Sequence, residues 1–313
     1  MSKYAFGIDV GGTSVKLGLL TIEGQIVEKW EIPTDVEDGG KNVLPDIAKS
    51  VNDKITEKGI DRNDIAGAGI GLPGPVDGNG VINKAVNLHW DRKFNVADDL
   101  SKLLGGLLVK AGNDANVAAL GEVWQGAGKG YKDMVMVTLG TGVGGGVIHD
   151  GKIITGAFGA GGEIGHLVIK PDESIHCNCG NCGCLEQYAS ATGIVRLLKE
   201  ELGSSDDDSI LRDSELSAKN MWEAVKQGDA LAIRVAEKFG YYLGWGLSII
   251  AGVLNPEVFV LGGGVSRSGD VILPYIEKNF KKYVFHGCSE AKIERATLGN
   301  DAGLIGAAKM VID

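Results

Sequence analysis

The pattern of apolar and polar positions predicts an α/β unit at the start of the chain. Three short apolar stretches are typical of a strand meander, over 4–9, 15–20 and 25–32. Glu23-Gly24 supplies the hairpin turn between the second and third strands. Apolar side chains then recur at helical spacing from Val43 to Ile55, and Gly59 ends that helix. A strand rich in small residues follows over 65–72, so this stretch predicts strands packed against a helix.

The rest of the chain also alternates predicted strands with predicted helices, and the strand meander occurs a second time. A helix over 96–104, with Asn95 as its N-cap, comes before a strand over 107–110. Later strands are expected over 134–139, 147–154, 165–169, 258–261 and 293–297, and later helices over 115–124, 192–202, 217–227, 231–254, 271–280 and 302–311. The first three of these strands form a second meander. The sequence therefore predicts two α/β domains around a ligand cleft, with 1–111 plus 300–313 as the smaller domain and 112–299 as the larger.

Composition and charge narrow the class of protein. Of the 313 residues, 44% are hydrophobic and 23% are charged, which is ordinary for a soluble globular protein. The formal net charge of −10, without a basic cluster, argues against nucleic acid and anionic membranes as partners. The first residues do not form a secretory signal, and the most apolar later segment, 243–254, is too short to span a bilayer. We therefore expect a cytoplasmic protein.

Glycine is unusually frequent, with 49 residues, and it gathers in turns that follow apolar strands. Three such turns are Gly11-Gly12-Thr13, Gly140-Thr141-Gly142 and Gly262-Gly263-Gly264. Successive backbone amides in such turns form anion-binding concavities, and three of them favour a site for nucleotide phosphates. Asp9, just before the first turn, either holds Mg²⁺ through water or only caps its own turn. Neither a P-loop motif nor a dinucleotide-binding glycine motif is present, so these nucleotide-binding classes are disfavoured.

Four of the five cysteines lie within eight positions, from Cys177 to Cys184, which indicates one local purpose. Thiolates at this spacing, with an imidazole upstream, suit a tetrahedral structural zinc site. The predicted ligands are His166, Cys177, Cys179 and Cys184, with Cys182 in reserve. The alternatives are disulfides or free thiols without a metal. Glu163 and Glu186 flank the cluster and, with His166, would give fixed acceptors for a hydroxyl-rich ligand, or else cap helices or lie in solvent.

Asn113-Asp114 lies between a predicted strand and a predicted helix. Either residue could serve as the N-cap of that helix, and this alone would explain the pair. An aspartate at such a junction also points into a cleft, where it can accept a hydroxyl proton as that oxygen attacks a γ-phosphate. Asn113 would then hold the neighbouring hydroxyl. Position alone does not separate the two interpretations.

Four motifs in this order carry a family resemblance. They are Asp-Val-Gly-Gly-Thr, Leu-Gly-Thr-Gly-Val-Gly-Gly-Gly, Gly-Gly-Glu-Ile-Gly-His and Cys-x-Cys-Gly-x-x-Gly-Cys-x-Glu, and they resemble the ROK family of sugar kinases and repressors. Within that family the chain looks most like the bacterial ATP-dependent glucokinases. The resemblance covers nearly the whole chain. It implies the actin-like (ribonuclease-H-like) ATPase fold, and it often goes with dimers or tetramers, so a homo-oligomer is expected.

The resemblance also implies roles for particular residues. Asp114 would be the base that deprotonates the sugar 6-hydroxyl, and the sugar would lie against Asn113, Glu163, His166 and Glu186. His166 would serve zinc with one ring nitrogen and the sugar with the other. The first two glycine turns match the family's phosphate motifs, and 261–264 matches its adenosine motif. Cys182 is a departure, since the family pattern leaves that position unconstrained.

The expected activity is phosphorylation of D-glucose by ATP, with Mg²⁺ as cofactor and a structural zinc. Fructokinase or N-acylmannosamine kinase activity is the main alternative, and polyphosphate is an alternative donor. A DNA-binding repressor is not expected, because the first predicted phosphate strand begins at Tyr4 and the chain is acidic. A non-catalytic sugar sensor is disfavoured because Asp114 is present.

Overall fold

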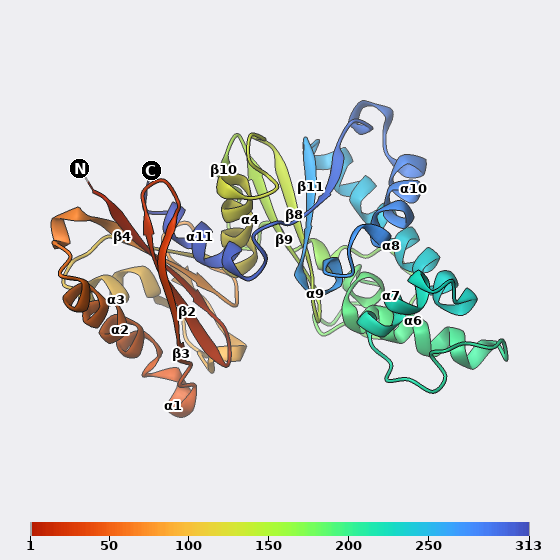
Figure 1. Cartoon of the computed structure of the whole chain (residues 1–313), viewed down its shortest axis with the longest axis horizontal. Helices are drawn as coiled ribbons and strands as arrows, with labels where there is room; N and C mark the ends of the chain where they lie inside the picture. Colours follow the sequence, from red (N-terminus) through yellow and green to blue (C-terminus); the bar gives the residue numbers. More distant parts are fainter. Residues whose placement is uncertain (1, 313) are drawn as a thin grey trace. The chain divides into compact units, whose positions relative to one another are not determined.

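The first sheet has five strands in the order β3-β2-β1-β4-β7 in the computed structural model, which describes residues 2–312 (Figure 1). Its strands are β1 (Tyr4–Val10), β2 (Ser14–Thr21), β3 (Ile26–Pro33), β4 (Ile65–Leu72) and β7 (Val109–Asn113). The first three form the predicted antiparallel meander, and β4 and β7 then continue the sheet parallel to β1. The carboxyl ends of β1, β4 and β7 therefore lie at the same end of the sheet. Ligands of open α/β sheets bind outside this end of the strands.

Helices cover the two faces of this sheet, so its central strands β1 and β4 are buried along most of their length (Figure 1). Phe6, Ile8 and Leu17 pack with one set of helices, α2 (Val43–Lys58) and α3 (Val96–Leu103). On the other face, Ala5 and Leu20 pack with α11 (Ala302–Lys309). Two glycines let α11 lie close to the strands there: a Cβ on Gly7 would be 2.0 Å from the Leu304 carbonyl oxygen, and one on Gly69 would be 1.7 Å from that of Ala307.

The second sheet repeats this plan, with the order β10-β9-β8-β11-β12. Its strands are β8 (Met134–Leu139), β9 (Val143–His149), β10 (Lys152–Ile153), β11 (Val258–Gly262) and β12 (Lys292–Arg295). In both sheets the first strand of the meander is central and two later strands extend the sheet beyond it. The later strands β11 and β12 are parallel to β8. The repeat suggested by the sequence is thus visible in the strand order.

Most of the regular secondary structure that follows β10 is helical. Besides α11, the helices there are α5 (Glu186–Ala189), α6 (Ala191–Ser204), α7 (Ala218–Lys226), α8 (Ala230–Leu254), α9 (Gly263–Ser266) and α10 (Leu273–Tyr283). The long helix α8 is largely buried, and Gly240 and Gly244 let α10 approach it: a Cβ on either would be 2.3–2.5 Å from a carbonyl oxygen of α10. The remaining α-helices and strands of the described residues are α1 (Glu37–Gly40), α4 (Asp114–Gln125), β5 (Val81–Ile82) and β6 (Phe94–Asn95).

The chain divides into two compact units. Unit 1 comprises Met1–Gly130, Gly146–Gly162 and Thr297–Asp313, and unit 2 comprises Tyr131–Gly145 and Glu163–Ala296. The α/β class with two mixed sheets is confirmed. The domain boundaries expected from the sequence, 1–111 with 300–313 against 112–299, stay a prediction. Among the described residues, no helix combines the length and the apolar character needed to cross a bilayer.

Two predicted strands are wrong. The segment 147–154, predicted as one strand, contains the end of β9, a turn at Asp150-Gly151 and β10, which pairs antiparallel with β9. Residues 165–169 were expected to complete the second meander, but a 3-10 helix occupies Ile164–His166 and only an isolated bridge joins Val168 to Cys184. The backbone groups of this segment bond to the cysteine loop instead: the Ile169 amide donates to Gly183 O at 2.8 Å, and the Leu167 carbonyl accepts from Leu185 at the same distance. The strand predicted over 107–110 lies two to three residues later, at Val109–Asn113.

Candidate active site and metal centre

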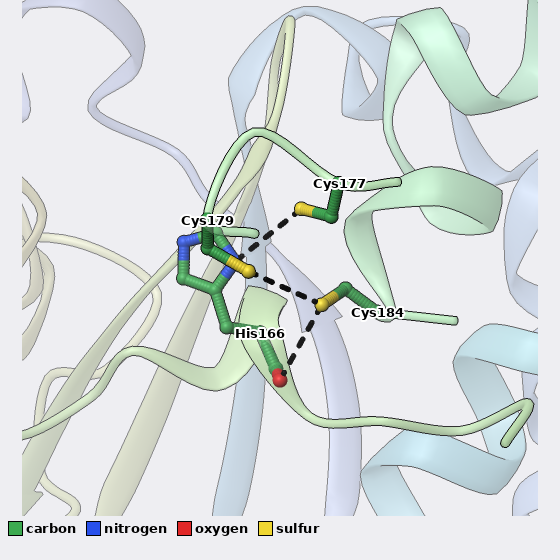
Figure 2. A group of neighbouring side chains, drawn as sticks. All are labelled: His166, Cys177, Cys179 and Cys184. Atoms are coloured by element: carbon green, nitrogen blue, oxygen red, sulfur yellow. Dashed lines mark hydrogen bonds between the residues drawn. The ribbon is translucent and has the colours of Figure 1, made fainter. Parts of the chain in front are cut away.

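The four predicted metal ligands lie together in unit 2 (Figure 2). One donor atom from each of His166, Cys177, Cys179 and Cys184 falls within 4.8 Å of the others. The Cys179 and Cys184 sulfurs are 3.6 Å apart, and the Cys177 sulfur is 3.8 Å from His166 Nδ1. A tetrahedral zinc with the usual Zn–S and Zn–N bond lengths needs donor separations of roughly 3.6–3.8 Å. The donor set therefore fits a structural zinc ion with four protein ligands.

The loop that carries the cysteines is held by its own backbone. The Cys177 amide donates to Asn181 O at 2.7 Å, and Gly180 donates back to Cys177 O at 2.9 Å. Gly180 and Gly183 have φ of 94° and 75°, a left-handed conformation that side chains disfavour. A Cβ on Gly183 would also lie 1.9 Å from Lys170 O. The Cys-x-Cys turn predicted from the glycines is thus closed by backbone hydrogen bonds within the loop.

The thiols of this cluster differ in acidity. Burial raises the pKa of Cys177 to about 12, and burial also raises the pKa of Cys184. The pKa of the exposed Cys179 is lowered, mainly by the hydrogen bond from the Asn181 backbone amide. Thiols bind zinc as thiolates, so a bound cation displaces these protons. Without a cation the two buried sulfurs are therefore thiols, so metal binding at this cluster releases protons.

Cys182 stands apart from the cluster. Its sulfur lies 3.4 Å from Nδ1 of His176, with which it shares an isolated backbone bridge. None of the five cysteines, all of them within the described residues, forms a disulfide. The geometry therefore favours the predicted ligand set without Cys182.

Two carboxylates border the cluster on either side of the His166 ring. Nε2 of His166 lies 3.9 Å from Glu163, and Nδ1, the nitrogen nearest Cys177, lies 3.9 Å from Glu186. Glu186 begins α5 and is mostly buried, whereas the Glu163 side chain is about half exposed, at 48%. Oε1 of Glu186 accepts from the Cys177 thiol at 3.0 Å, and Oε2 accepts from the Val143 amide at 3.4 Å. Glu186 is thus an acceptor held in place beside the cluster, and Glu163 is a more exposed one.

The second and third glycine turns also lie in unit 2, at the carboxyl ends of the neighbouring parallel strands β8 and β11. Within the second turn, the Gly140 amide donates to Gly142 O at 3.0 Å. Gly142 touches Glu186, because a Cβ there would be 2.4 Å from its Oε2. Gly263 of the third turn has φ of 84° and packs on Leu139, the last residue of β8. The structure therefore brings two of the three predicted phosphate turns together with the acceptor set.

Unit 1 carries the other predicted residues. Asp9 lies near the end of β1, 4.0 Å from Lys16 and against the Cα of Gly303 in α11. Burial raises the pKa of Asp9, and the Lys16 ammonium partly opposes this. The first glycine turn, Gly11 to Thr13, is closed by a hydrogen bond from the Gly11 amide to Ser14 O at 2.9 Å.

Asn113 and Asp114 join the end of β7 to the start of α4, which is also in unit 1. The Asn113 side chain is the N-cap: its oxygen accepts from the amides of Ala115 and Asn116, at 3.0 and 3.2 Å. Its amide group donates to Asp114 at 2.9 Å and to Gly74 O at 3.2 Å. An asparagine side chain has two donors and two acceptor lone pairs, so Asn113 is fully engaged. It orients the carboxylate of Asp114, which also accepts from Ala115 N at 2.8 Å.

Several residues that support these sites were not predicted from the sequence. Gln187 accepts from the Cys184 amide at 3.0 Å and donates to Ile175 O at 2.9 Å, which ties two parts of the cysteine loop. Glu122 in α4 is fully buried, and its carboxylate accepts from the backbone amides of Ala127, Thr297 and Leu298. A carboxylate within the apolar stretch 117–124 is a signal that could have indicated such a role.

The chain is similar to known proteins over nearly its whole length. A glucokinase of Halalkalibacterium halodurans is 42% identical over 99% of this chain and 95% of its own, and a glucokinase of Thermotoga maritima is 34% identical over 97% and 96%. The crystal structure of a ROK family glucokinase from Streptomyces griseus, in complex with glucose and AMPPNP, has a TM-score of 0.77 at 34% identity and covers 98% of both chains. The predicted fold class is therefore confirmed. Residues 5–313 match the model of the ROK family, and the chain belongs to that family.

Proposed function

We propose that the protein is an ATP-dependent glucokinase, which transfers the γ-phosphoryl group of ATP to the 6-hydroxyl of D-glucose. Support for the class of substrate comes from relatives named glucokinase at 34–42% identity over nearly full length. Support for ATP as donor comes from the related structure that holds glucose and AMPPNP. The observation in this chain that carries the proposal is the His166 ring, with Nδ1 beside the cysteines and Nε2 beside Glu163.

That ring explains why a metal centre would belong in a sugar site. Zinc would be held by His166, Cys177, Cys179 and Cys184, and it would act as a structural brace, since four protein ligands fill a tetrahedral shell. The brace fixes the orientation of the imidazole, whose other nitrogen is then available to a sugar hydroxyl. Glu163 and Glu186 would accept from further hydroxyl groups of the pyranose. Side chains held in this way select a hydroxyl arrangement rather than an apolar shape.

Chemistry would fall to Asp114. Its carboxylate takes the proton of the 6-hydroxyl as that oxygen attacks the γ-phosphorus in line. Asn113 holds the carboxylate in place through the 2.9 Å hydrogen bond from its amide group. The amides of the three glycine turns would receive the phosphates, and the turn at 262–264 the adenosine side of the nucleotide. Asp9 would hold Mg²⁺ through water, and this ion would neutralise charge on the phosphates. Positioning supplies most of the rate, since phosphoryl transfer asks for little covalent work by the protein.

The direct test is an ADP-release assay with ATP and Mg²⁺ against glucose, fructose, mannose and N-acetylmannosamine, with metal analysis of the same sample. The proposal predicts the highest kcat/KM for glucose and about one zinc per chain. A clear preference for fructose or N-acetylmannosamine would replace glucose with that sugar. Polyphosphate in place of ATP tests the donor, and turnover with polyphosphate but not ATP would contradict the proposal. The expected homo-oligomer and the cytoplasmic location stay predictions.

A further inference from the structure

A buried carboxylate outside the proposed ligand and sugar sets holds the base of the cysteine loop. Only 7% of the Glu173 side chain is exposed. Oε1 accepts from the backbone amides of Ser174 and Ile175, at 2.8 and 3.1 Å. Oε2 accepts from the Tyr188 hydroxyl and from Arg196 Nη1, the latter at 3.0 Å. Each carboxylate oxygen therefore has two donors, which is the arrangement of a fully satisfied buried anion.

These partners belong to the elements that the proposed site needs. Glu173 lies in the stretch between His166 and Cys177, so its backbone is part of the metal loop. Tyr188 lies in α5, one helical half-turn after Glu186. Arg196 lies in α6, and its guanidinium stacks 4.4 Å from the centre of the Tyr188 ring. The other neighbour of Tyr188 is Tyr242 of α8, with ring centroids 4.1 Å apart. One carboxylate thus connects the loop to α5 and α6, and the stacked rings connect them to α8.

None of the contacts of Glu173 involves a cysteine, His166 or Glu163. The hydrogen bonds consequently do not depend on a metal ion. They leave the segment 173–175 fixed on one side of Cys177, and α5 fixed on the other side of Cys184. A donor set whose flanks are already ordered loses less conformational entropy when it closes on an ion. Residues that orient the metal ligands without binding the ion therefore have large effects on metal affinity.

We propose that Glu173 is a positioning residue, a second anchor of the cysteine loop that acts independently of the metal and keeps both the donor set and Glu186 in place. The part that concerns Glu186 rests on the proposed glucokinase function. The part that concerns metal retention does not, because it needs only the cluster of one histidine and three cysteines. A metal measurement therefore separates the two.

The test is the rate at which zinc passes from the purified holoprotein to a chromogenic chelator in Glu173→Gln and in wild type. The substitution keeps the size of the side chain, but its NH2 group faces donors whichever way the amide turns. On one side these are the amides of Ser174 and Ile175, and on the other the Tyr188 hydroxyl and the Arg196 guanidinium. We expect zinc release to accelerate by at least about 10-fold, the lower end of the effect of outer-shell groups on metal affinity. The KM for glucose should rise more than kcat falls, since Glu186 binds substrate in the proposed function. Release at the wild-type rate, or wild-type protein that takes up no zinc, would overturn the proposal.

Two further variants show whether faster zinc release comes from the loss of Glu173 itself or from general unfolding. Glu200 is the other carboxylate near Arg196: it lies 3.7 Å from the Arg196 Nε, and its side chain is 51% exposed. The Glu200→Gln variant should release zinc at the wild-type rate. Tyr188→Phe removes one hydroxyl donor and should give a smaller acceleration than Glu173→Gln. Hydrogen exchange on zinc-stripped wild type should still show protected amides at Ser174 and Ile175. Rapid exchange of both amides in that sample would show that the anchor needs the metal and would contradict the proposal.

Discussion

The Cys177 thiol donates a hydrogen bond to the Glu186 carboxylate, with 3.0 Å between Sγ and Oε1. The second oxygen of the same carboxylate accepts from the amide of Val143, which follows the second glycine turn. Glu186 is thus the side chain that joins the proposed zinc ligands to the second predicted phosphate turn. Gly142 is required for this contact, because a Cβ there would lie 2.4 Å from Oε2.

The position of Glu186 predicts a binding defect without metal loss. In Glu186→Gln the carboxylate charge is removed but the size of the side chain is kept, so the cysteine loop should retain its zinc. A hydrogen bond to a charged group is worth about 1.5–3 kcal/mol, which corresponds to a roughly 10- to 150-fold rise in the KM for glucose. Steady-state kinetics and metal analysis of one preparation measure both quantities. The exposed Glu215→Gln is the control. Zinc lost together with activity would show that Glu186 acts on the metal centre instead.

The separation of Cys182 from the cluster predicts unequal effects of two matched substitutions. Cys184 is fully buried among the proposed ligands, whereas Cys182 contacts His176. Cys184→Ser should lower the zinc content to well below one ion per chain, because a hydroxyl is a poor substitute for a thiolate on zinc. Cys182→Ser should retain full zinc. If Cys182→Ser lost the metal and Cys184→Ser kept it, the ligand set would be wrong.

The buried carboxylate of Glu122 predicts a stability effect in unit 1. Glu122→Ala would leave the partly buried amides of Ala127, Thr297 and Leu298 without their acceptor. We expect the free energy of unfolding to fall by about 1–3 kcal/mol, the cost of leaving buried hydrogen-bond donors without their acceptor. Urea unfolding followed by tryptophan fluorescence measures this. Glu223→Ala, whose side chain is half exposed, should change it by less than about 0.5 kcal/mol. Equal effects of the two variants would contradict the proposed role of Glu122.

The depressed pKa of Glu173 predicts that its contribution to the free energy of unfolding depends on pH. The hydrogen bond from Tyr188, with those from Ile175, Arg196 and Ser174, lowers its pKa from 4.5 to about 2. A carboxyl whose pKa is depressed in the folded state stabilises that state fully above its unfolded pKa, and this contribution is lost as the pH falls from 4.5 towards 2. The difference in unfolding free energy between wild type and Glu173→Gln should therefore be constant from about pH 9 to pH 6 and shrink below about pH 4.5. Urea titrations of both proteins across this range check it, and a difference that grows on acidification would refute it.

Local patterns were enough to predict much of the fold. The apolar run from Tyr4 gave a strand, and the helical spacing from Val43 gave α2, whose end at Gly59 is confirmed by a φ of 62°. The four clustered cysteines could be predicted as one centre because their spacing is a property of a single loop. Such features depend on residues close together in the chain, where periodicity and turn chemistry decide the conformation.

The remainder depends on contacts between residues far apart in sequence. The apolar segment from Gly165 to Ile169 looks like a strand, yet its backbone bonds to residues 183 and 185 of the cysteine loop. The partners of Glu173 are 15 and 23 residues away, on helices whose placement no local pattern specifies. The position of Asn113 indicated an N-cap, and Asn113 does cap α4, but nothing in the sequence indicated that the same side chain would also orient Asp114.

The central claim, glucose phosphorylation with Asp114 as base, is tested most directly by comparing wild type with Asp114→Asn. Asparagine keeps an acceptor for the Ala115 amide, so the start of α4 should stay folded. Phosphorus NMR of a reaction with ATP, Mg²⁺ and glucose should show glucose 6-phosphate and ADP in equal amounts for wild type. The variant should form them about 10²–10⁴ times more slowly, the contribution of a general base, while calorimetry still detects glucose binding. Asp99→Asn, at an exposed site in unit 1, should react like wild type. Wild type that forms no glucose 6-phosphate, or an Asp114→Asn variant that forms it at nearly the wild-type rate, would contradict the claim.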